Sequence, residues 1–524
     1  MADPAEGRRV NLRNHARHPL LTSLTANPSS RLSTYGLFAA GAYDRDLHRE
    51  LKAAWLPFFA GAGLDACVGE MAAGADLLGD RLAEAAAAGT PVDVWRLFGS
   101  LTLTVVSACA FGLDMPTGID GGASSPEAAA LLDAARTIFA TGRSSSAWAL
   151  VHQALPWAAP LIRLATRLAP GPALAALDGA RGVIMAKGME LVLAERERQG
   201  AEEGEGEEAA AAPSKKGSFL SLFARRARRA ADRGDAAAAA ALFNPDVVVA
   251  QCFTFLLAGY ETTATALAFC VHHLSTHPAA AARAVAEMEA VLGGGSHAVA
   301  STADLARMPY LDAVFKEALR LTPPAPMTLR LAGEDQAVCG VFIPKGTWMQ
   351  VDTRAVQTDK AVWGPDAAAF KPERWATADE KTKAVGFNAF GAGTLSCVGA
   401  RFAETEAKLT LISLLRRFDF TPAGPEWVGA GRTDLDLETR LTMGPKHGVW
   451  VVPIVRGKKG VVDGGGGVPR TPTGVLGGPP ASLGGGASSS SDGEAEVEAE
   501  GGGGKGGVLA VAEAAGLRAR LVSK

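Results

Sequence analysis

The sequence has no CxxC pair among its six cysteines, which lie at positions 67, 109, 252, 270, 339 and 397. Without such pairs we expect neither a disulfide framework nor a structural zinc site, and a reducing compartment fits the chain better. An excess of positive charge is also missing, because 52 basic residues stand against 55 acidic ones. That balance excludes a nucleic-acid-binding protein held by a general basic field.

An apolar segment that could span a bilayer is missing from the start of the chain, and MADPAEGRRVNLRNHARHP is too polar for a secretory signal. The stretch from Ser144 to Ile162 carries no Asp, Glu, Lys or Arg, but Pro156 and Pro160 interrupt it. It predicts a peripheral membrane contact rather than a crossing. We therefore expect no transmembrane anchor in this chain.

Changes in composition set the expected domain boundaries. The segment 457–524 is rich in Gly, Ser and Pro, and such a segment cannot bury enough apolar surface to offset its entropy. We predict a disordered tail there, a flexible loop near 198–217 and a folded domain at 46–456. The basic run at 224–233 is interpreted as the solvated face of a helix.

Helical periodicity dominates the folded domain. The Ala- and Leu-rich segments that carry it are 125–139, 172–197, 246–276, 278–292, 303–321 and 400–417. Strand-like segments are short and lie mainly in the carboxy-terminal half, at 330–353 and 447–455. The sequence predicts a mainly α protein with a small β-sheet subdomain, which is an α+β fold.

Cys397 is surrounded by glycines in the segment AFGAGTLSCVGARFAETEAKL. Gly391, Gly393 and Gly399 let the backbone turn tightly and approach a flat ligand where a Cβ would collide. A helix expected to begin near Ala400 would stabilise a thiolate through its free N–H groups. A lone cysteine is most often a small buried hydrophobe, but these neighbours favour a ligand-binding role.

The ten residues FGAGTLSCVG, from Phe390 to Gly399, resemble the haem-binding loop of the cytochrome P450 family, whose pattern is FxxGxRxCxG. The resemblance implies that Cys397 is the iron ligand of haem b, iron protoporphyrin IX, and that its thiolate favours O–O cleavage. Phe390, Gly391 and Gly399 would then contact the cofactor. The segment departs from the pattern at Leu395, which offers no donor where the family uses Arg or His for a haem propionate.

The segment AGYETT at 258–263 is similar to the oxygen-binding motif of the family's distal helix. Gly259 is expected to let the backbone approach the haem, with Ala258 in contact with it. Thr262 can hydrogen-bond a helix carbonyl or a ligand, and the resemblance implies that Glu261 and Thr262 deliver protons. The same six residues alone are also typical of an ordinary buried helix.

Two further segments follow in the family's order, FKEALRL with Glu317 and Arg320, and FKPERW with Arg374. Glu317 and Arg320 are three residues apart, so they share one face of a helix. The resemblance implies that Arg374 joins them in a Glu-Arg-Arg network beneath the haem. Bidentate contacts between arginine and a carboxylate suit that role because their geometry is fixed.

Three cations are expected to bind the haem propionates. Arg330 follows the Thr322-Pro323-Pro324 turn and matches the family arginine at the start of the first sheet. His48 and Lys52 align with the pattern HxxxR or WxxxR of helix C, where lysine keeps the charge but loses the bidentate fork. His48 is equally consistent with an exposed helix histidine.

The resemblance covers 46–456 and implies the cytochrome P450 fold, with the haem between the distal helix and the cysteine loop. Family members usually carry a longer segment before helix C, so we interpret 1–45 as a shortened amino-terminal region. The chain is most similar to the eukaryotic membrane-associated type. The cytosolic face of the endoplasmic reticulum is the expected location, with the plastid as the alternative.

The leading hypothesis is a haem-thiolate monooxygenase that inserts one atom of O2 into a small apolar substrate. Its electrons would come from NADPH through a diflavin reductase. The residues expected to face the substrate are Phe255, Ala258, Thr262, Pro326 to Leu329 and Leu441 to Met443. One alternative is an isomerase or dehydratase of a peroxide substrate, which the retention of Glu261 and Thr262 disfavours. The other is a truncated, non-catalytic haem protein, which Leu395, Lys52 and the short amino-terminal region keep open.

Overall fold

The computed structural model describes residues 16–17, 45–111, 126–140, 161, 164, 168, 171–202, 219–293, 300–424, 435–439 and 442–457. The chain divides into two units, Met1–Gly464 and Gly465–Lys524, and every described residue belongs to the first. Residues 458–524 of the tail predicted at 457–524 lie outside the described residues. Most of 1–45 and the loop expected near 198–217, from 203 onward, also lie outside them, so those predictions stay untested.

Helices form most of the described structure. Those of the amino-terminal half are α5 (Arg45–Trp55), α6 (Ala62–Asp65), α7 (Val68–Ala88), α8 (Val94–Phe111), α9 (Pro126–Ala140), α12 (Gly171–Glu202), α13 (Phe219–Asp232) and α14 (Ala236–Phe243). The remainder are α15 (Pro245–Thr276), α16 (Pro278–Leu292), α17 (Thr302–Leu305), α18 (Pro309–Leu321), α19 (Thr353–Gln357), α20 (Lys360–Trp363), α21 (Arg374–Thr377), α22 (Glu380–Gly386) and α23 (Ala400–Arg417). The predicted mainly α fold is therefore confirmed.

One predicted helix is in fact two. The segment 303–321 contains α17, which a capping box at Ser301 and Asp304 begins, and α18, which starts at Pro309. Proline is favoured in the first turn of a helix because its missing N–H has no helical partner there. The sequence signal for this boundary was therefore Pro309. The other predicted helical segments each form one helix.

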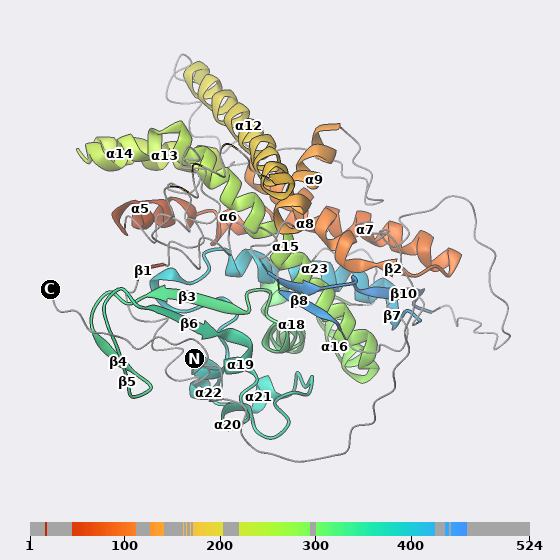
Figure 1. Cartoon of the computed structure of the whole chain (residues 1–524). Coiled ribbons are helices and arrows are strands. Elements are labelled where there is room, and N and C mark those ends of the chain that lie inside the picture. The colour runs from red at the N-terminus through yellow and green to blue at the C-terminus, as the bar shows by residue number, and fades with distance from the viewer. Residues whose placement is uncertain are drawn as a thin grey trace, which may run out of the picture. The chain divides into compact units, whose positions relative to one another are not determined.

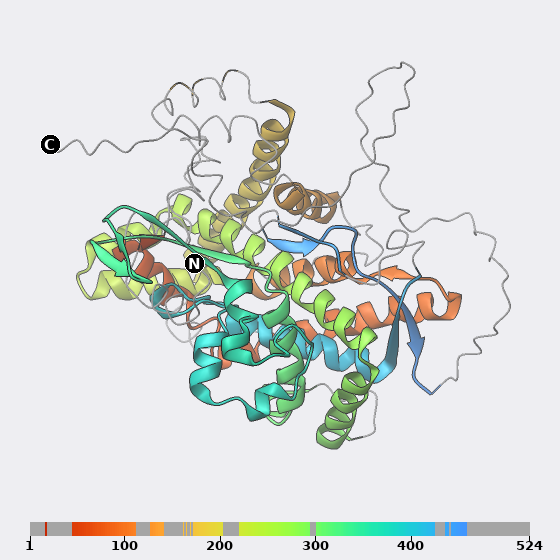
Figure 2. The same ribbon diagram turned by 60° about the horizontal axis from the view of Figure 1, so that its bottom comes forward.

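The described strands form four small antiparallel sheets. One has the order β1-β3-β6, with β1 (Ala16–Arg17), β3 (Met327–Leu331) and β6 (Trp348–Asp352). Another has the order β2-β10-β7, with β2 (Val92–Asp93), β10 (Trp450–Val455) and β7 (Phe418–Pro422). Two hairpins pair β4 (Gln336–Val338) with β5 (Val341–Ile343), and β8 (Leu437–Thr439) with β9 (Met443–Pro445). The β3–β6 and β7–β10 pairs lie on opposite sides of α15 in both views (Figures 1 and 2).

Helix α15 runs through the middle of the fold and contacts α8, α12, α18 and α23 (Figure 1). Both α8 and α15 are long and apolar enough to cross a membrane by length and composition. In each, 72% of the most apolar window is buried inside the fold, which is the property of a core helix. The hydrophobic effect of this buried surface holds α15 in place, and α15 in turn positions the site.

The basic run at 224–233 lies mostly on α13. Phe219 and Phe223 point into the core, whereas Arg225 and Arg229 are exposed. Arg226, between the two faces, donates to Glu50 of α5 at 2.9 Å. The interpretation of this run as a solvated helix face is confirmed.

Candidate cofactor site

The cysteine loop is a tight turn held by its own backbone. The N–H of Cys397 donates to the carbonyl of Phe390 at 2.8 Å, and that of Ser396 donates to the carbonyl of Gly393 at 3.1 Å. Gly391 and Gly393 have φ values of 70° and 76°, a region that other residues rarely adopt. Both glycines are therefore required by the turn, and Cys397 is exposed at its end.

Helix α23 begins three residues after Cys397. Its N-cap, Gly399, supplies no side-chain hydrogen bond, so the first N–H groups depend on the backbone or on a ligand. A Cβ at Gly399 would lie 3.4 Å from the ring of Phe59, which brings the α5–α6 connection against the loop. The predicted helix start is confirmed, and the stabilisation of a thiolate there stays a prediction.

Helix α5 brings the two predicted cations of the amino-terminal half to this loop. The Nζ of Lys52 donates to the carbonyl of Thr394 at 2.7 Å, next to Leu395. His48, one turn earlier on the same face, is buried. The alternative of an exposed helix histidine is therefore wrong, while the roles of His48 and Lys52 toward a propionate stay predictions.

Arg330 is a buried cation on β3. Its side chain is 5% exposed, and its Nη1 donates to the carbonyl of Leu329 at 3.0 Å. Among the described residues its Nε atom has no hydrogen-bond partner, and burial lowers the pKa of Arg330 to about 10. A buried charge with an unmet donor is costly. The site therefore fits an anionic group, and a carboxylate of a bound cofactor would supply it.

The distal motif lies in the middle of α15. Ala258 is exposed and Thr262 partly exposed, although most of the surrounding helix is buried. The Oγ1 of Thr262 donates to the carbonyl of Ala258 at 2.6 Å, so the first of the two predicted uses of this hydroxyl is the one observed. Ala258 and Thr262 thus share an accessible face of an otherwise buried helix, as a site beside a flat cofactor requires.

Gly259 has a packing role that its sequence did not predict. A Cβ at this position would lie 2.5 Å from Cγ2 of Val106 on α8. On the same side, the Oγ1 of Thr102 donates to the carbonyl of Tyr260 at 2.7 Å. Gly259 therefore permits close packing of α8 on α15, and its expected role in letting the backbone approach the haem stays a prediction.

Glu261 is buried beside this face. Its Oε1 accepts a hydrogen bond of 2.7 Å from the hydroxyl of Thr442, which immediately precedes β9. Thr442 belongs to the segment 441–443 that was expected near the substrate, whereas Leu441 lies outside the described residues. No sequence pattern indicated this contact, because it joins residues that are 181 positions apart.

Phe255 was expected to face the substrate, and this expectation is wrong. Its side chain is 3% exposed. Its ring stacks on those of Trp55 and Phe59, with centroids 4.8 and 5.3 Å away. These rings join the cysteine-loop side of the molecule to α15 as part of the core. The apolar character of Phe255 is explained by this packing alone.

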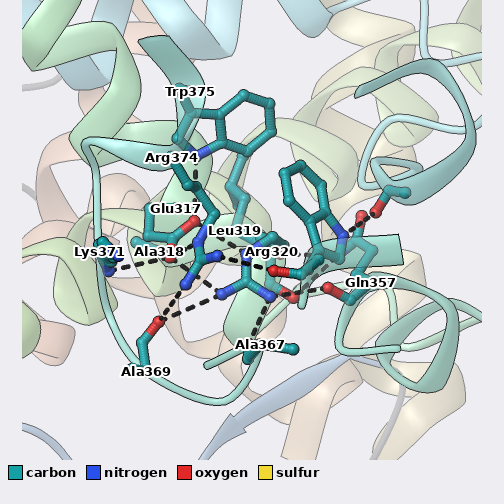
Figure 3. Close-up of polar contacts among 12 residues, drawn as sticks. Glu317, Ala318, Leu319, Arg320, Gln357, Ala367, Ala369, Lys371, Arg374 and Trp375 are labelled. Carbon is teal, nitrogen blue, oxygen red and sulfur yellow. Dashed lines mark hydrogen bonds and ion pairs between the residues drawn. The ribbon is translucent and has the colours of Figure 1, made fainter. Parts of the chain in front are cut away.

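Glu317, Arg320 and Arg374 form the predicted network (Figure 3). Arg320 donates to both carboxylate oxygens of Glu317, from Nε at 2.8 Å and from Nη2 at 2.9 Å. Arg374 donates from Nε to Oε1 of Glu317 at 2.7 Å. Neither Glu317 nor Arg320 is exposed at all, so this pairing is confirmed as a buried structural unit.

Other groups complete the network, and sequence reasoning missed them. The indole N–H of Trp375 and the backbone N–H of Lys371 donate to Glu317 at 3.0 and 2.9 Å. Nη1 of Arg320 donates to the carbonyls of Gln357 and Ala367 (Figure 3). The carboxylate and both guanidinium groups are therefore well satisfied, which a buried ion pair needs to offset desolvation. The position of Trp375 next to Arg374 could have indicated its contact with the network. No sequence pattern indicated the contact made by Gln357.

The described residues contain no group of three or more His, Cys, Asp and Glu side chains that could hold a metal ion. Among the described residues, a metal at Cys397 would therefore have no such cluster to complete its ligand set, and a bound cofactor could supply the remaining ligands. A haem supplies them through its four ring nitrogens. Its carboxylates would meet the unsatisfied donor of Arg330, so the residues present fit this group.

Comparisons with known proteins agree with this fit. A family model described as Cytochrome P450 matches residues 33–428. Thromboxane-A synthase of Rattus norvegicus is 29% identical over 422 residues, which cover 78% of this chain and 75% of the relative. Cytochrome P450 3A12 of Canis lupus familiaris is 38% identical over 176 residues, which cover 33% of this chain and 34% of that protein.

Thromboxane-A synthase of Mus musculus is 36% identical over 217 residues, or 41% of this chain and 39% of that protein. The chain thus spans well under half the length of the mouse and dog relatives in these matches. The family model, by contrast, runs from before α5 to beyond β7 and includes the cysteine loop, the distal motif and the Glu-Arg-Arg network. On the strength of that match, the chain belongs to the cytochrome P450 family.

Proposed function

We propose that this protein is a haem-thiolate monooxygenase that inserts one oxygen atom of O2 into a small apolar organic substrate. The observation that carries the proposal is the glycine turn that presents an exposed Cys397 at the start of α23. When bound, haem b would supply the activation of oxygen. The chain supplies the thiolate, the groups that hold the cofactor and the groups that move protons.

Several residues would hold the haem. Cys397 is the iron ligand, and Arg330 offers an unsatisfied buried donor to a carboxylate. Lys52, now on the carbonyl of Thr394, can add a second charge-assisted hydrogen bond, and the buried His48 stands one turn away. The remaining contacts proposed for the cofactor come from Phe390, Gly391, Gly399 and Ala258.

Thr262 and Glu261 would deliver protons. The hydroxyl of Thr262 is partly exposed and donates to a helix carbonyl, and rotation about its Cβ–Oγ bond lets it donate elsewhere. Glu261 is the neighbouring acid, and its carboxylate is already held by a hydrogen bond. General acid catalysis requires a positioned acid within hydrogen-bond reach, and Glu261 would act in this way in its protonated form.

Electrons are proposed to come from NADPH through a diflavin reductase at the cytosolic face of the endoplasmic reticulum. A relative from Oidiodendron maius, named a self-sufficient cytochrome P450 monooxygenase, is 37% identical over 207 residues and is covered over 18% of its length. Its printed name supports the proposed reaction class. An apolar substrate agrees with Met327, which is 39% exposed in the segment expected to face it.

A second candidate function is the rearrangement of a peroxide substrate without O2 or a reductase. It is favoured by one observation: the relative from Rattus norvegicus, whose match covers 78% of this chain, is named a synthase and not a monooxygenase. The buried hydrogen bond on Glu261 favours the first proposal, because rearrangement of a peroxide needs no proton delivery from it.

The test is the absorption spectrum of reduced protein under carbon monoxide, followed by turnover. We expect the red-shifted Soret band of a thiolate-ligated haem, and its loss in Cys397→Ser. The matched control is Cys339→Ser, because Cys339 is also exposed but lies in the β4–β5 turn. NADPH-dependent product supports the monooxygenase, and product from an added organic peroxide alone supports rearrangement. A mutant that kept the band would exclude Cys397 as the ligand.

A further inference from the structure

Thr442 reaches the distal helix from the far end of the chain. Its hydroxyl donates to Oε1 of Glu261 at 2.7 Å, and both side chains are buried. The next residue is fixed as well, because the N–H of Met443 donates to the carbonyl of Pro324 at 2.9 Å. The position of the Thr442 hydroxyl is therefore set by the backbone of β9 rather than by a flexible loop.

Neighbouring groups limit the movement of the Glu261 carboxylate. A Cβ at Gly444 would lie 4.0 Å from Oε1 of Glu261 and 3.4 Å from the ring of Trp95. The indole N–H of Trp95 donates to Oγ1 of Thr265 at 2.9 Å. Thr265 is four residues after Glu261 and so lies on the same face of α15. Trp95 and β9 thus cover this face together.

We propose that Thr442 is a positioning residue for proton delivery by Glu261, an inference that rests on the proposed monooxygenase function. Successive residues of an α-helix are about 100° apart, so Glu261 and Thr262 project from adjacent sides of α15. The rotamer of Glu261 therefore decides how far its carboxylate lies from Thr262. A donor fixed on Oε1 selects one rotamer, which is the condition for efficient proton transfer to a neighbouring hydroxyl.

The test compares two replacements of one side chain. Thr442→Val keeps the shape and removes the donor, whereas Thr442→Ser keeps the donor. The control is Thr439→Val, an exposed threonine on β8 whose Cα pairs with that of Met443. Three quantities are measured: haem loading, product formed per NADPH, and the infrared carboxyl band that Glu261→Gln removes from the resting protein.

We expect Thr442→Val to load haem normally, to shift the Glu261 band and to lower product per NADPH by about tenfold, with peroxide formed instead. Thr442→Ser and Thr439→Val should resemble the unchanged protein in all three quantities. A serine variant as uncoupled as the valine variant would show that the methyl group matters rather than the hydroxyl, and would overturn the proposal.

Two other outcomes would also overturn the proposed role of Thr442, and only one of them would overturn the monooxygenase proposal as well. If Glu261→Gln lowers product per NADPH while Thr442→Val does not, Thr442 has no positioning role and the monooxygenase proposal stands. If the unchanged protein binds no haem, the proposed function fails and this inference fails with it. The infrared band reports on the contact without turnover, so it separates the hydrogen bond from its catalytic consequence.

Discussion

Glu317 and Arg320 face each other on one side of α18 with two parallel hydrogen bonds, and neither side chain is exposed to solvent. The i, i+3 spacing places them on one helix face, but exposed pairs at that spacing contribute little. The Glu317–Arg320 pair differs from such exposed pairs because it is completely buried. A buried pair that loses one member leaves an uncompensated charge, and this network has two arginines around one carboxylate.

We therefore expect Glu317→Ala to lower the free energy of unfolding by about 3–5 kcal/mol, because the buried Arg320 would lose its carboxylate partner. Arg374 would keep its ion pair with Asp366 at 3.2 Å. Thermal or urea unfolding measures the loss. Glu380→Ala removes a carboxylate from the exposed pair with Lys383 and should change little. Unchanged melting of haem-loaded Glu317→Ala protein would contradict the structural role of the network.

Gly259→Ala is expected to cost about 1–3 kcal/mol, because its Cβ would overlap Val106 in a packed helix interface. Val106→Ala in the same chain should recover much of the loss. The matched control is Gly179→Ala on α12, where nothing lies within 4 Å of the added Cβ. There the helix should gain about 0.5–1 kcal/mol. A neutral Gly259→Ala would mean that α8 can move away freely.

Leu395→Arg is expected to slow haem loss by about ten- to a hundredfold, the effect of one added charge-assisted hydrogen bond to a propionate. Lys52, one of the cations proposed to bind a propionate, already reaches the carbonyl of the preceding residue, so an arginine at position 395 would lie beside it. Leu395→Met, which adds no donor, is the control. Transfer of haem to excess apoprotein scavenger measures the rate. Equal loss from the arginine and methionine variants would place the propionates elsewhere.

His273 makes stability sensitive to acid. Its ring stacks on Phe370 with centroids 4.6 Å apart, and its Nε2 is buried without a hydrogen-bond partner among the described residues. Burial, with smaller contributions from His272, His277 and Arg320, lowers the pKa of His273 from 6.5 to about 3. In the unfolded chain the histidine takes up a proton below pH 6.5, but in the fold it does not. Stability is therefore lost as the pH falls from about 6.5 toward 3.

We expect His273→Phe to reduce that loss. Through this group, each pH unit below 6.5 should lower the unfolding free energy of the unchanged protein by up to about 1.4 kcal/mol. The variant should not show this loss. Melting temperatures at pH 7 and pH 5 give the comparison. At pH 7 the variant should be no less stable, because it removes a buried nitrogen without a partner. If the melting temperatures of both proteins fell equally between pH 7 and pH 5, His273 would not be the source of the acid sensitivity.

The sequence predicted the parts of this molecule that depend on local pattern. Helical periodicity located α15 and α23, and the glycines around Cys397 predicted a turn that requires positive φ at Gly391 and Gly393. The spacing of Glu317 and Arg320 predicted a shared face. Each of these features is decided by residues close together in the chain, so each leaves a readable pattern.

The features that the sequence did not predict have a common physical origin. Gly259 and Phe255 lie in the distal helix, and their roles depend on what packs against them from α8 and from α5. Apolar and small residues suit a ligand pocket and a helix interface equally well, so composition cannot separate the two. The contact from Thr442 to Glu261 likewise joins distant segments. The role of each such residue depends on neighbours that are distant in the sequence.

The sheet with the order β2-β10-β7 has a consequence for biosynthesis. Its middle strand, β10, is the last of the three to leave the ribosome, and β2 and β7 each pair only with β10 among the described strands. Until residue 455 has emerged, Val92–Asp93 and Phe418–Pro422 present unpaired edges, which are prone to association with other chains. Completion of this domain must therefore wait for the end of translation of its last strand.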